Sequence, residues 1–185
     1  MMKSMRLTFG AMCLALAILL PQVFHVFGMQ QAGTLFLPMH LPVLLGGMLL
    51  GPVYGLFLGF FAPLISMVLT SMPGAQRVVF MMIELAAYGA FSGLAYHQLK
   101  LKDKPLGALY ALIIAMVAGR IVNAIGLIVG SMALGIPLGN FATVFASVVT
   151  GLPGIAIQFI FVPVIVSALY KGGRFNLVEK KHAAI

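Results

Sequence analysis

The sequence predicts an all-α integral membrane protein, a bundle of six transmembrane helices that forms a single domain over residues 1–185. Composition is the first observation: 62% of the residues are hydrophobic and only 8% are charged. A soluble domain carries roughly 25% charged residues, so this chain has too few to cover a water-facing surface. Length is the second: a spanning helix needs about 20 apolar residues, and the chain has room for six with short connections.

Glycine, proline and polar residues divide the chain into six predicted spans. The first apolar run follows two basic residues, as in a signal peptide, but it lacks a clear cleavage site and is expected to remain as a helix. In chain order the spans are Leu7–Val26, Leu37–Leu50, Val53–Leu69, Val78–Tyr96, Leu106–Ser131 and Leu152–Tyr170.

Two stretches are expected to depart from simple spanning helices. The second span is short and meets the third at Gly51-Pro52, so it is predicted to begin inside a re-entrant or partly buried loop. The segment Phe141–Val149 is predicted to be a short interfacial helix between the last two spans.

The basic residues predict the orientation of the bundle. Lys and Arg are retained in the cytoplasm, and a six-helix topology puts nine of the eleven on one side. Both termini are therefore expected to be cytoplasmic. These cations flank apolar helices, which argues against nucleic-acid binding and for contact with anionic lipid; they are Lys3, Arg6, Lys100, Lys102, Lys104, Lys171, Arg174, Lys180 and Lys181.

Two opposite charges lie at membrane depth. Glu84 is in the middle of the fourth span and Arg120 in the middle of the fifth. An isolated charge is costly there, so the two helices are predicted to pack with these residues facing each other or a shared wet cavity. The pair either locks the helices together or contacts a bound solute.

Three uncharged polar residues are further candidates for substrate binding. Asn123 follows Arg120 by three residues on the same helical face, and Gln158 lies deep in the last span. Residues of this kind are more often helix–helix hydrogen bonds than ligand contacts. His40 lies between Pro38 and Pro42, which prevent a regular helix start. Irregular backbone survives at depth only where it lines a cavity or is packed in protein.

The chain lacks the patterns of an enzyme or a cofactor site. Cys13 is the only cysteine, no cluster has metal-ligand spacing, and no nucleophile–base set is evident. No phosphate-binding loop is present either. If ATP drives transport by this protein, another subunit must hydrolyse it.

Small residues recur at helical spacing in two places. Gly47, Gly51, Gly55 and Gly59 are best explained by internal helix packing, although Pro52 must interrupt a continuous helix. Ala11 and Ala15 show the same spacing in the first span, where packing and a partner compete as explanations.

Together these features resemble the substrate-binding S-components of energy-coupling factor (ECF) transporters, which take up vitamins in bacteria. The resemblance covers essentially the whole chain and rests on its size, six spans and internal termini. The segments that carry it are Ala11-Met12-Cys13-Leu14-Ala15, Pro38-Met39-His40-Leu41-Pro42 with Gly46-Gly47 and Gly51-Pro52, Glu84-Leu85-Ala86-Ala87-Tyr88-Gly89, and Ala118-Gly119-Arg120-Ile121-Val122.

The resemblance implies a location in the bacterial cell membrane and a mechanism. The protein would bind a vitamin at its outer side and topple in the membrane when docked on a transmembrane coupling subunit driven by two ATPase subunits. Ala11 and Ala15 would contact the coupling subunit. The outer loops would hold substrate, which adds Gln31 and Arg77 to the candidates.

The sequence leaves the substrate open. Arg77 or Arg120 could pair with the carboxylate of pantothenate, whereas spans rich in Gly and Met suit a large, uncharged ligand such as cobalamin. Folate and riboflavin are not excluded. A stand-alone secondary transporter, a small channel or a structural membrane subunit are the alternative functions, although no internal repeat supports a carrier.

Overall fold

The computed structural model describes residues 3–27, 32–104, 106–134 and 141–171. Every regular element in these ranges is a helix. Six helices are long and apolar enough to cross a membrane. The predicted all-α bundle of six spans is confirmed.

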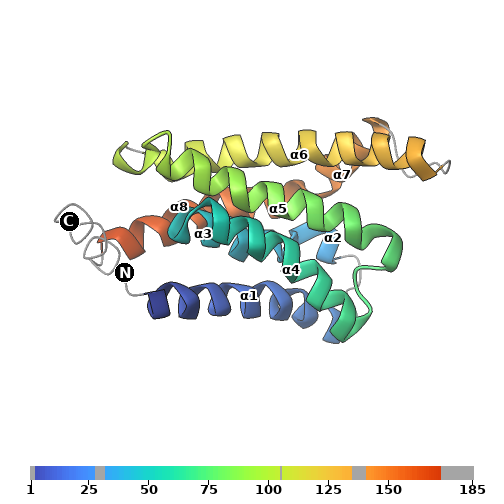
Figure 1. The fold of residues 1–185 in the computed structure, drawn as a ribbon, viewed down its shortest axis with the longest axis horizontal. Coiled ribbons are helices and arrows are strands. Elements are labelled where there is room, and N and C mark those ends of the chain that lie inside the picture. The colour runs from blue at the N-terminus through green and yellow to red at the C-terminus, as the bar shows by residue number, and fades with distance from the viewer. Residues whose placement is uncertain (1–2, 28–31, 105, 135–140, 172–185) are drawn as a thin grey trace.

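The long helices follow the predicted spans to within a few residues. They are α1 (Lys3–Val26), α4 (Pro52–Thr70), α5 (Ala75–His97), α6 (Gly107–Leu134) and α8 (Leu152–Lys171). The turn between α5 and α6 contains the 3-10 helix η1 (Leu101–Asp103). The start of α1, this turn and the end of α8 all lie at the left end of Figure 1, as an even number of crossings requires.

The second span is broken, as predicted. The short helix α2 (Ala32–Phe36) is followed by an irregular stretch, and α3 (His40–Leu50) begins only after it. Leu37 takes a left-handed conformation at the break, with φ of 48°. The predicted interfacial segment also forms a helix, α7 (Phe141–Thr150), most of whose side chains are exposed.

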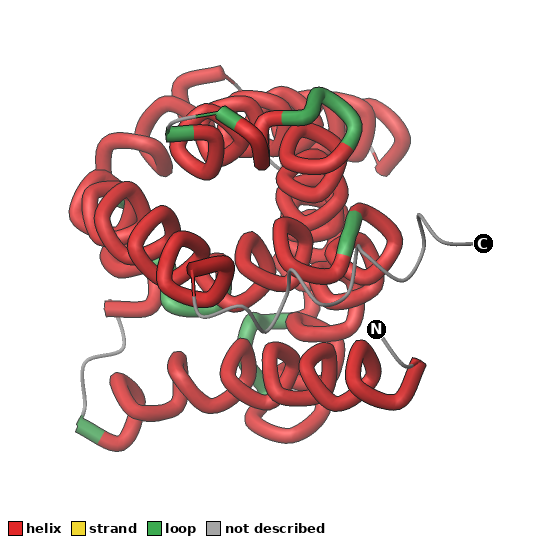
Figure 2. Tube along the Cα trace, turned by 90° about the vertical axis from the view of Figure 1, so that its left-hand side faces the viewer, coloured by secondary structure: helices red, strands yellow, loops and turns green. Residues whose placement is uncertain are grey.

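The helix α3 is the centre of the bundle. Each of its residues from Pro42 to Leu50 is buried, as expected of a helix that is apolar on all sides. One buried cluster joins α3 to α5, α6 and α8, and a second joins it to α1, α4 and α5. Figure 2, which looks along the bundle, shows α1 at its lower edge.

Glycines let α3, α4 and α5 approach at backbone distance. A Cβ atom on Gly47 or Gly55 would collide with the carbonyl of Gly89 on α5, and one on Gly59 with the carbonyl of Leu85. The packing interpretation of these glycines is thus confirmed. Gly51 serves differently, because it forms the turn before α4 with φ of 103°.

Candidate functional site

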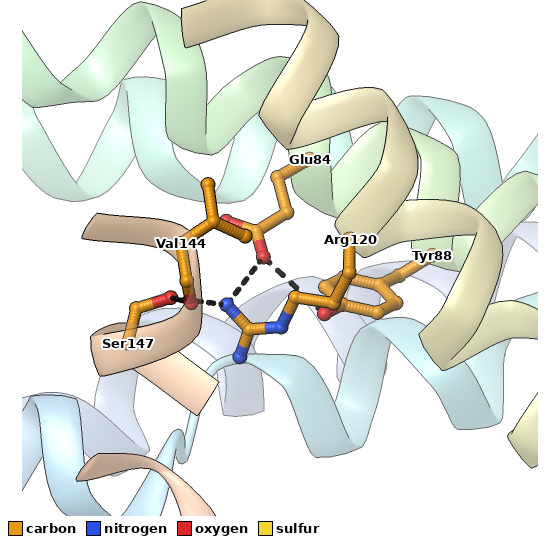
Figure 3. Close-up of polar contacts among 5 residues, drawn as sticks. All are labelled: Glu84, Tyr88, Arg120, Val144 and Ser147. Atoms are coloured by element: carbon orange, nitrogen blue, oxygen red, sulfur yellow. Dashed lines mark hydrogen bonds and ion pairs between the residues drawn. The ribbon is translucent and has the colours of Figure 1, made fainter. Parts of the chain in front are cut away.

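Glu84 and Arg120 form an ion pair between α5 and α6. Arg120 Nη1 lies 3.1 Å from Glu84 Oε1, and the two side chains are only 17% and 11% exposed. Tyr88, one turn along α5, donates its hydroxyl to the same carboxylate oxygen at 3.2 Å. Figure 3 shows the three side chains converging from neighbouring helices. The predicted packing of the two charges against each other is confirmed.

The ion pair also reaches α7. Arg120 Nη1 donates to Ser147 Oγ at 3.0 Å, and that hydroxyl in turn donates to the carbonyl of Val144 at 2.7 Å (Figure 3). Sequence analysis missed both Tyr88 and Ser147. The spacing of four residues between Glu84 and Tyr88 was a usable signal, since such residues share a helical face; nothing in the sequence pointed to Ser147.

His40 is the first residue of α3 and is almost completely buried, with 5% of its surface exposed. Neither ring nitrogen has a hydrogen-bond partner among the described residues. Its ring packs edge-on against Tyr88, with 5.1 Å between the ring centroids. Buried polar atoms are normally hydrogen-bonded, so two unpaired nitrogens in one ring are the mark of an incomplete site.

Gln158 connects α8 to the break in the second span. Its side-chain amide Nε2 donates to the carbonyl oxygen of Leu37 at 3.4 Å, and the backbone N–H of His40 donates to the same oxygen at 3.1 Å. Gln158 therefore satisfies part of the irregular backbone that precedes α3. This is the helix–helix role that the sequence analysis weighed against ligand binding.

A cavity of about 440 Å³ brings these elements together. Its polar lining consists of His40, Tyr88, Arg120 and Gln158. The remaining walls are apolar and are formed by Leu37, Ile113, Met116, Val117, Ile121, Val148, Leu152, Ile155 and Phe159. A largely apolar pocket with a few convergent polar groups is the usual form of a small-molecule site.

Among the described residues, three other predicted site residues, Arg77, Glu84 and Asn123, are not in the lining of this cavity. Asn123 is buried on α6, and Arg77 is exposed in the first turn of α5. Gln31 lies outside the described residues. Ala11 and Ala15 are exposed on α1, whereas Ala17 faces the core at 1% exposure.

Comparison with known families then identifies the chain. The family model for the substrate-specific component of ECF transporters matches residues 5–166. The chain belongs to this family. No curated protein and no solved structure matched it. The resemblance seen in the sequence is therefore confirmed at the level of the family.

Membership in the ECF family defines the class of function. The chain is a substrate-specific subunit of an ECF transporter: it binds a small molecule, associates with other transporter components, and is a transport subunit, not an enzyme. Together with the six apolar helices, this makes it a multi-pass membrane protein. Among the described residues, no three His, Cys, Asp or Glu side chains gather as a metal site would require.

Proposed function

We propose that this S-component captures a water-soluble vitamin in the cavity between α3, α5, α6 and α8. The observation that carries the proposal is the convergence of His40, Arg120 and Gln158 on one cavity in a chain of this family. The three residues come from three different helices. The sequence pointed to Arg120 and Gln158 as polar side chains at membrane depth, and to His40 through the irregular backbone around it.

The proposed orientation places this cavity toward the outside of a bacterial cell membrane, with both termini in the cytoplasm. Arg6 and the lysines around η1 lie at one end of the bundle, and Arg77 begins α5 at the other (Figure 1). The positive-inside rule assigns the former end to the cytoplasm. The breaks before α3 and before α8 occur in the half of the bundle that is farther from the cytoplasmic end.

The resemblance to S-components implies that the proposed uptake step requires a coupling subunit and two ATPase subunits. This agrees with the lack of a phosphate-binding loop in the sequence, since ATP would then be hydrolysed on another subunit. Ala11 and Ala15 are our candidates for the docking face. They are exposed on one face of α1 between Leu7 and Leu19, which are 69% and 59% exposed. Small side chains there would let a partner helix approach closely before the subunit topples.

The cavity supports a small substrate over a large one. A volume of about 440 Å³ accommodates roughly 15 non-hydrogen atoms, given about 30 Å³ for each water in the liquid. Pantothenate is of that size, whereas cobalamin is several times larger. We therefore place pantothenate ahead of cobalamin among the two leading candidates from the sequence.

The test is uptake into liposomes that contain the purified chain with or without the coupling and ATPase subunits. We expect vitamin binding by the chain alone and uptake only with the complete complex and ATP. Uptake by the chain alone would instead establish a secondary carrier.

A second experiment tests the docking face. Ala11→Trp and Ala15→Trp are expected to abolish uptake while vitamin affinity stays within about twofold of the unsubstituted chain, because the bulky side chain blocks close helix approach. Ile160→Trp is the matched control, since Ile160 is 63% exposed on α8, away from α1. Normal uptake by both Ala11→Trp and Ala15→Trp would refute the docking assignment.

A further inference from the structure

The cavity contains hydrogen-bonding capacity that the protein itself leaves unused. Both ring nitrogens of His40 lack a partner among the described residues, although the side chain is 95% buried and lines the cavity. A buried polar group without a hydrogen-bond partner destabilises the folded protein. A bound molecule that meets these nitrogens would recover that cost.

Arg120 lines the same cavity and has N–H groups that make no hydrogen bond to the described residues. Both bonds that the described residues make to its guanidinium use one nitrogen, Nη1, which faces Glu84 and Ser147. Figure 3 shows Nη2 pointing away from Glu84. The edge formed by Nε and Nη2 is the geometry that binds a carboxylate through two parallel hydrogen bonds.

The beginning of α3 adds a positive partial charge beside His40. This helix has 11 residues, no side-chain cap on its first turn and no acidic residue there. The N-terminus of a helix carries about +0.5 elementary charge. The C-terminus of α2 offsets little of it, because α2 is a single turn and the Leu37 carbonyl that follows it already accepts bonds from His40 N and Gln158.

The sum of these charges determines which ligand charge the cavity favours. Arg120 is the one charged side chain among the described residues of the lining, and Glu84, which pairs with it outside the lining, cancels its charge. The helix end leaves the cavity with a net positive potential, which disfavours a cation. An uncharged ligand would leave the fork of Arg120 with weaker acceptors than a carboxylate provides, since charge-assisted bonds are roughly twice as strong as neutral ones.

We propose that the substrate is a small molecule with a single carboxylate, which binds between the Nε–Nη2 edge of Arg120 and His40 at the start of α3. Its apolar body lies against Ile113 and Met116 of α6 and Phe159 of α8, which also line the cavity. This inference rests on the proposed function, because it describes the substrate of the same cavity. Broken membrane helices elsewhere present their N-termini to substrate carboxylates in the same manner.

The first test compares acids with their uncharged counterparts. The purified chain in nanodiscs of uncharged-headgroup phosphatidylcholine is titrated with pantothenate and pantothenol, nicotinate and nicotinamide, and biotin and its amide. Binding is read by calorimetry and native mass spectrometry. At least one acid is expected to bind roughly 10- to 100-fold more tightly than its counterpart, since a hydrogen bond to a charged group contributes about 1.5–3 kcal/mol.

The outcomes separate the inference from the proposed function. Equal or tighter binding of an uncharged vitamin would overturn the carboxylate inference and leave the S-component proposal standing. Folded protein that retains no vitamin would overturn both. Retention of a fatty acid or phospholipid alone would show that the carboxylate or phosphate comes from lipid, and this too would overturn the proposal of a soluble acid.

A double variant then tests the assigned residues. Glu84→Gln with Arg120→Gln removes both charges together, so neither is left buried without its partner. We expect the preference for the acid over its uncharged counterpart to be lost. His40→Leu should weaken acid binding roughly tenfold, and the exposed Lys100→Gln at the far end of the bundle should change nothing. An unchanged acid preference in the double variant would refute the role of Arg120.

Discussion

The crossing of α4 and α5 offers a sharp test of the packing, through Gly89→Ala. An ideal Cβ atom on Gly89 collides with the carbonyl group of Gly55 and lies 2.9 Å from its Cα. The obstruction is reciprocal, because a Cβ on Gly55 meets the carbonyl of Gly89. All of these contacts are with backbone, which cannot rotate away as a flexible side chain could.

The expected cost follows from two opposing effects. Alanine improves helix propensity over glycine by about 1 kcal/mol. To restore ordinary contact, α4 and α5 must separate by about 0.5 Å or more, and overpacking of this kind costs about 1–3 kcal/mol or more. Since rigid backbone puts the cost at the upper end of that range, we expect a net destabilisation of about 2 kcal/mol or more.

The assay is equilibrium unfolding in mild detergent, with SDS as the denaturant and helical circular dichroism as the signal. Gly74→Ala is the matched control, because no atom lies within 4 Å of its added Cβ and its φ of −59° suits alanine. Its stability should stay within about 0.5 kcal/mol of the unsubstituted chain. If Gly89→Ala unfolds at the same SDS fraction as this control, the close approach of α4 and α5 is wrong.

Two further predictions use the same unfolding assay. Glu84→Gln leaves Arg120 uncompensated at membrane depth and should lower the free energy of unfolding by about 2–4 kcal/mol. The double variant with Arg120→Gln should lose at least about 1 kcal/mol less than the sum of the losses in the two single variants. If the two single losses add to within about 0.5 kcal/mol of the loss in the double variant, the ion pair is wrong. Gln158→Leu removes the side-chain donor to the Leu37 carbonyl and should cost about 1–2 kcal/mol, with faster amide exchange at the break before α3. The exposed Gln98→Leu is its control, and equal stability of the two variants would exclude that bond.

Most of the fold could be predicted from the sequence because the bilayer restricts it strongly. Spanning segments must be apolar, about 20 residues long and internally hydrogen-bonded, so composition and break residues located all six. The break before α3 was predictable for a local reason, since Pro38 disfavours a helical conformation of the residue before it, Leu37. The expectation that Pro42 also prevents a helix start was wrong, because Pro42 lies in the first turn of α3, where proline is tolerated. The contact between Glu84 and Arg120 was predictable because each was the other's only available opposite charge at depth.

The residues of the candidate site could be predicted from the sequence, but their convergence on one cavity could not. His40 and Gln158 are 118 positions apart, and the spacing along a chain says which face of a helix a residue occupies, not which helix lies beside that face. Only the tertiary structure placed α8 against the break before α3 and so joined Gln158 to the Leu37 carbonyl. The same limit explains why Arg77 looked as plausible as Arg120 before the cavity was known.

The sequence by itself therefore determined the class of this protein: a six-span membrane bundle, a member of the S-component family, with one buried pair of opposite charges. This class can be determined from the sequence because each polar group in lipid carries a free-energy cost, and the position of every polar residue can be read from the sequence. The tertiary structure alone decided that Tyr88 and Ser147 share the ion pair, and that neither nitrogen of His40 finds a partner in the part of the chain that the structure describes. Those features depend on how each helix is rotated against its neighbours, which arises from packing of the whole bundle.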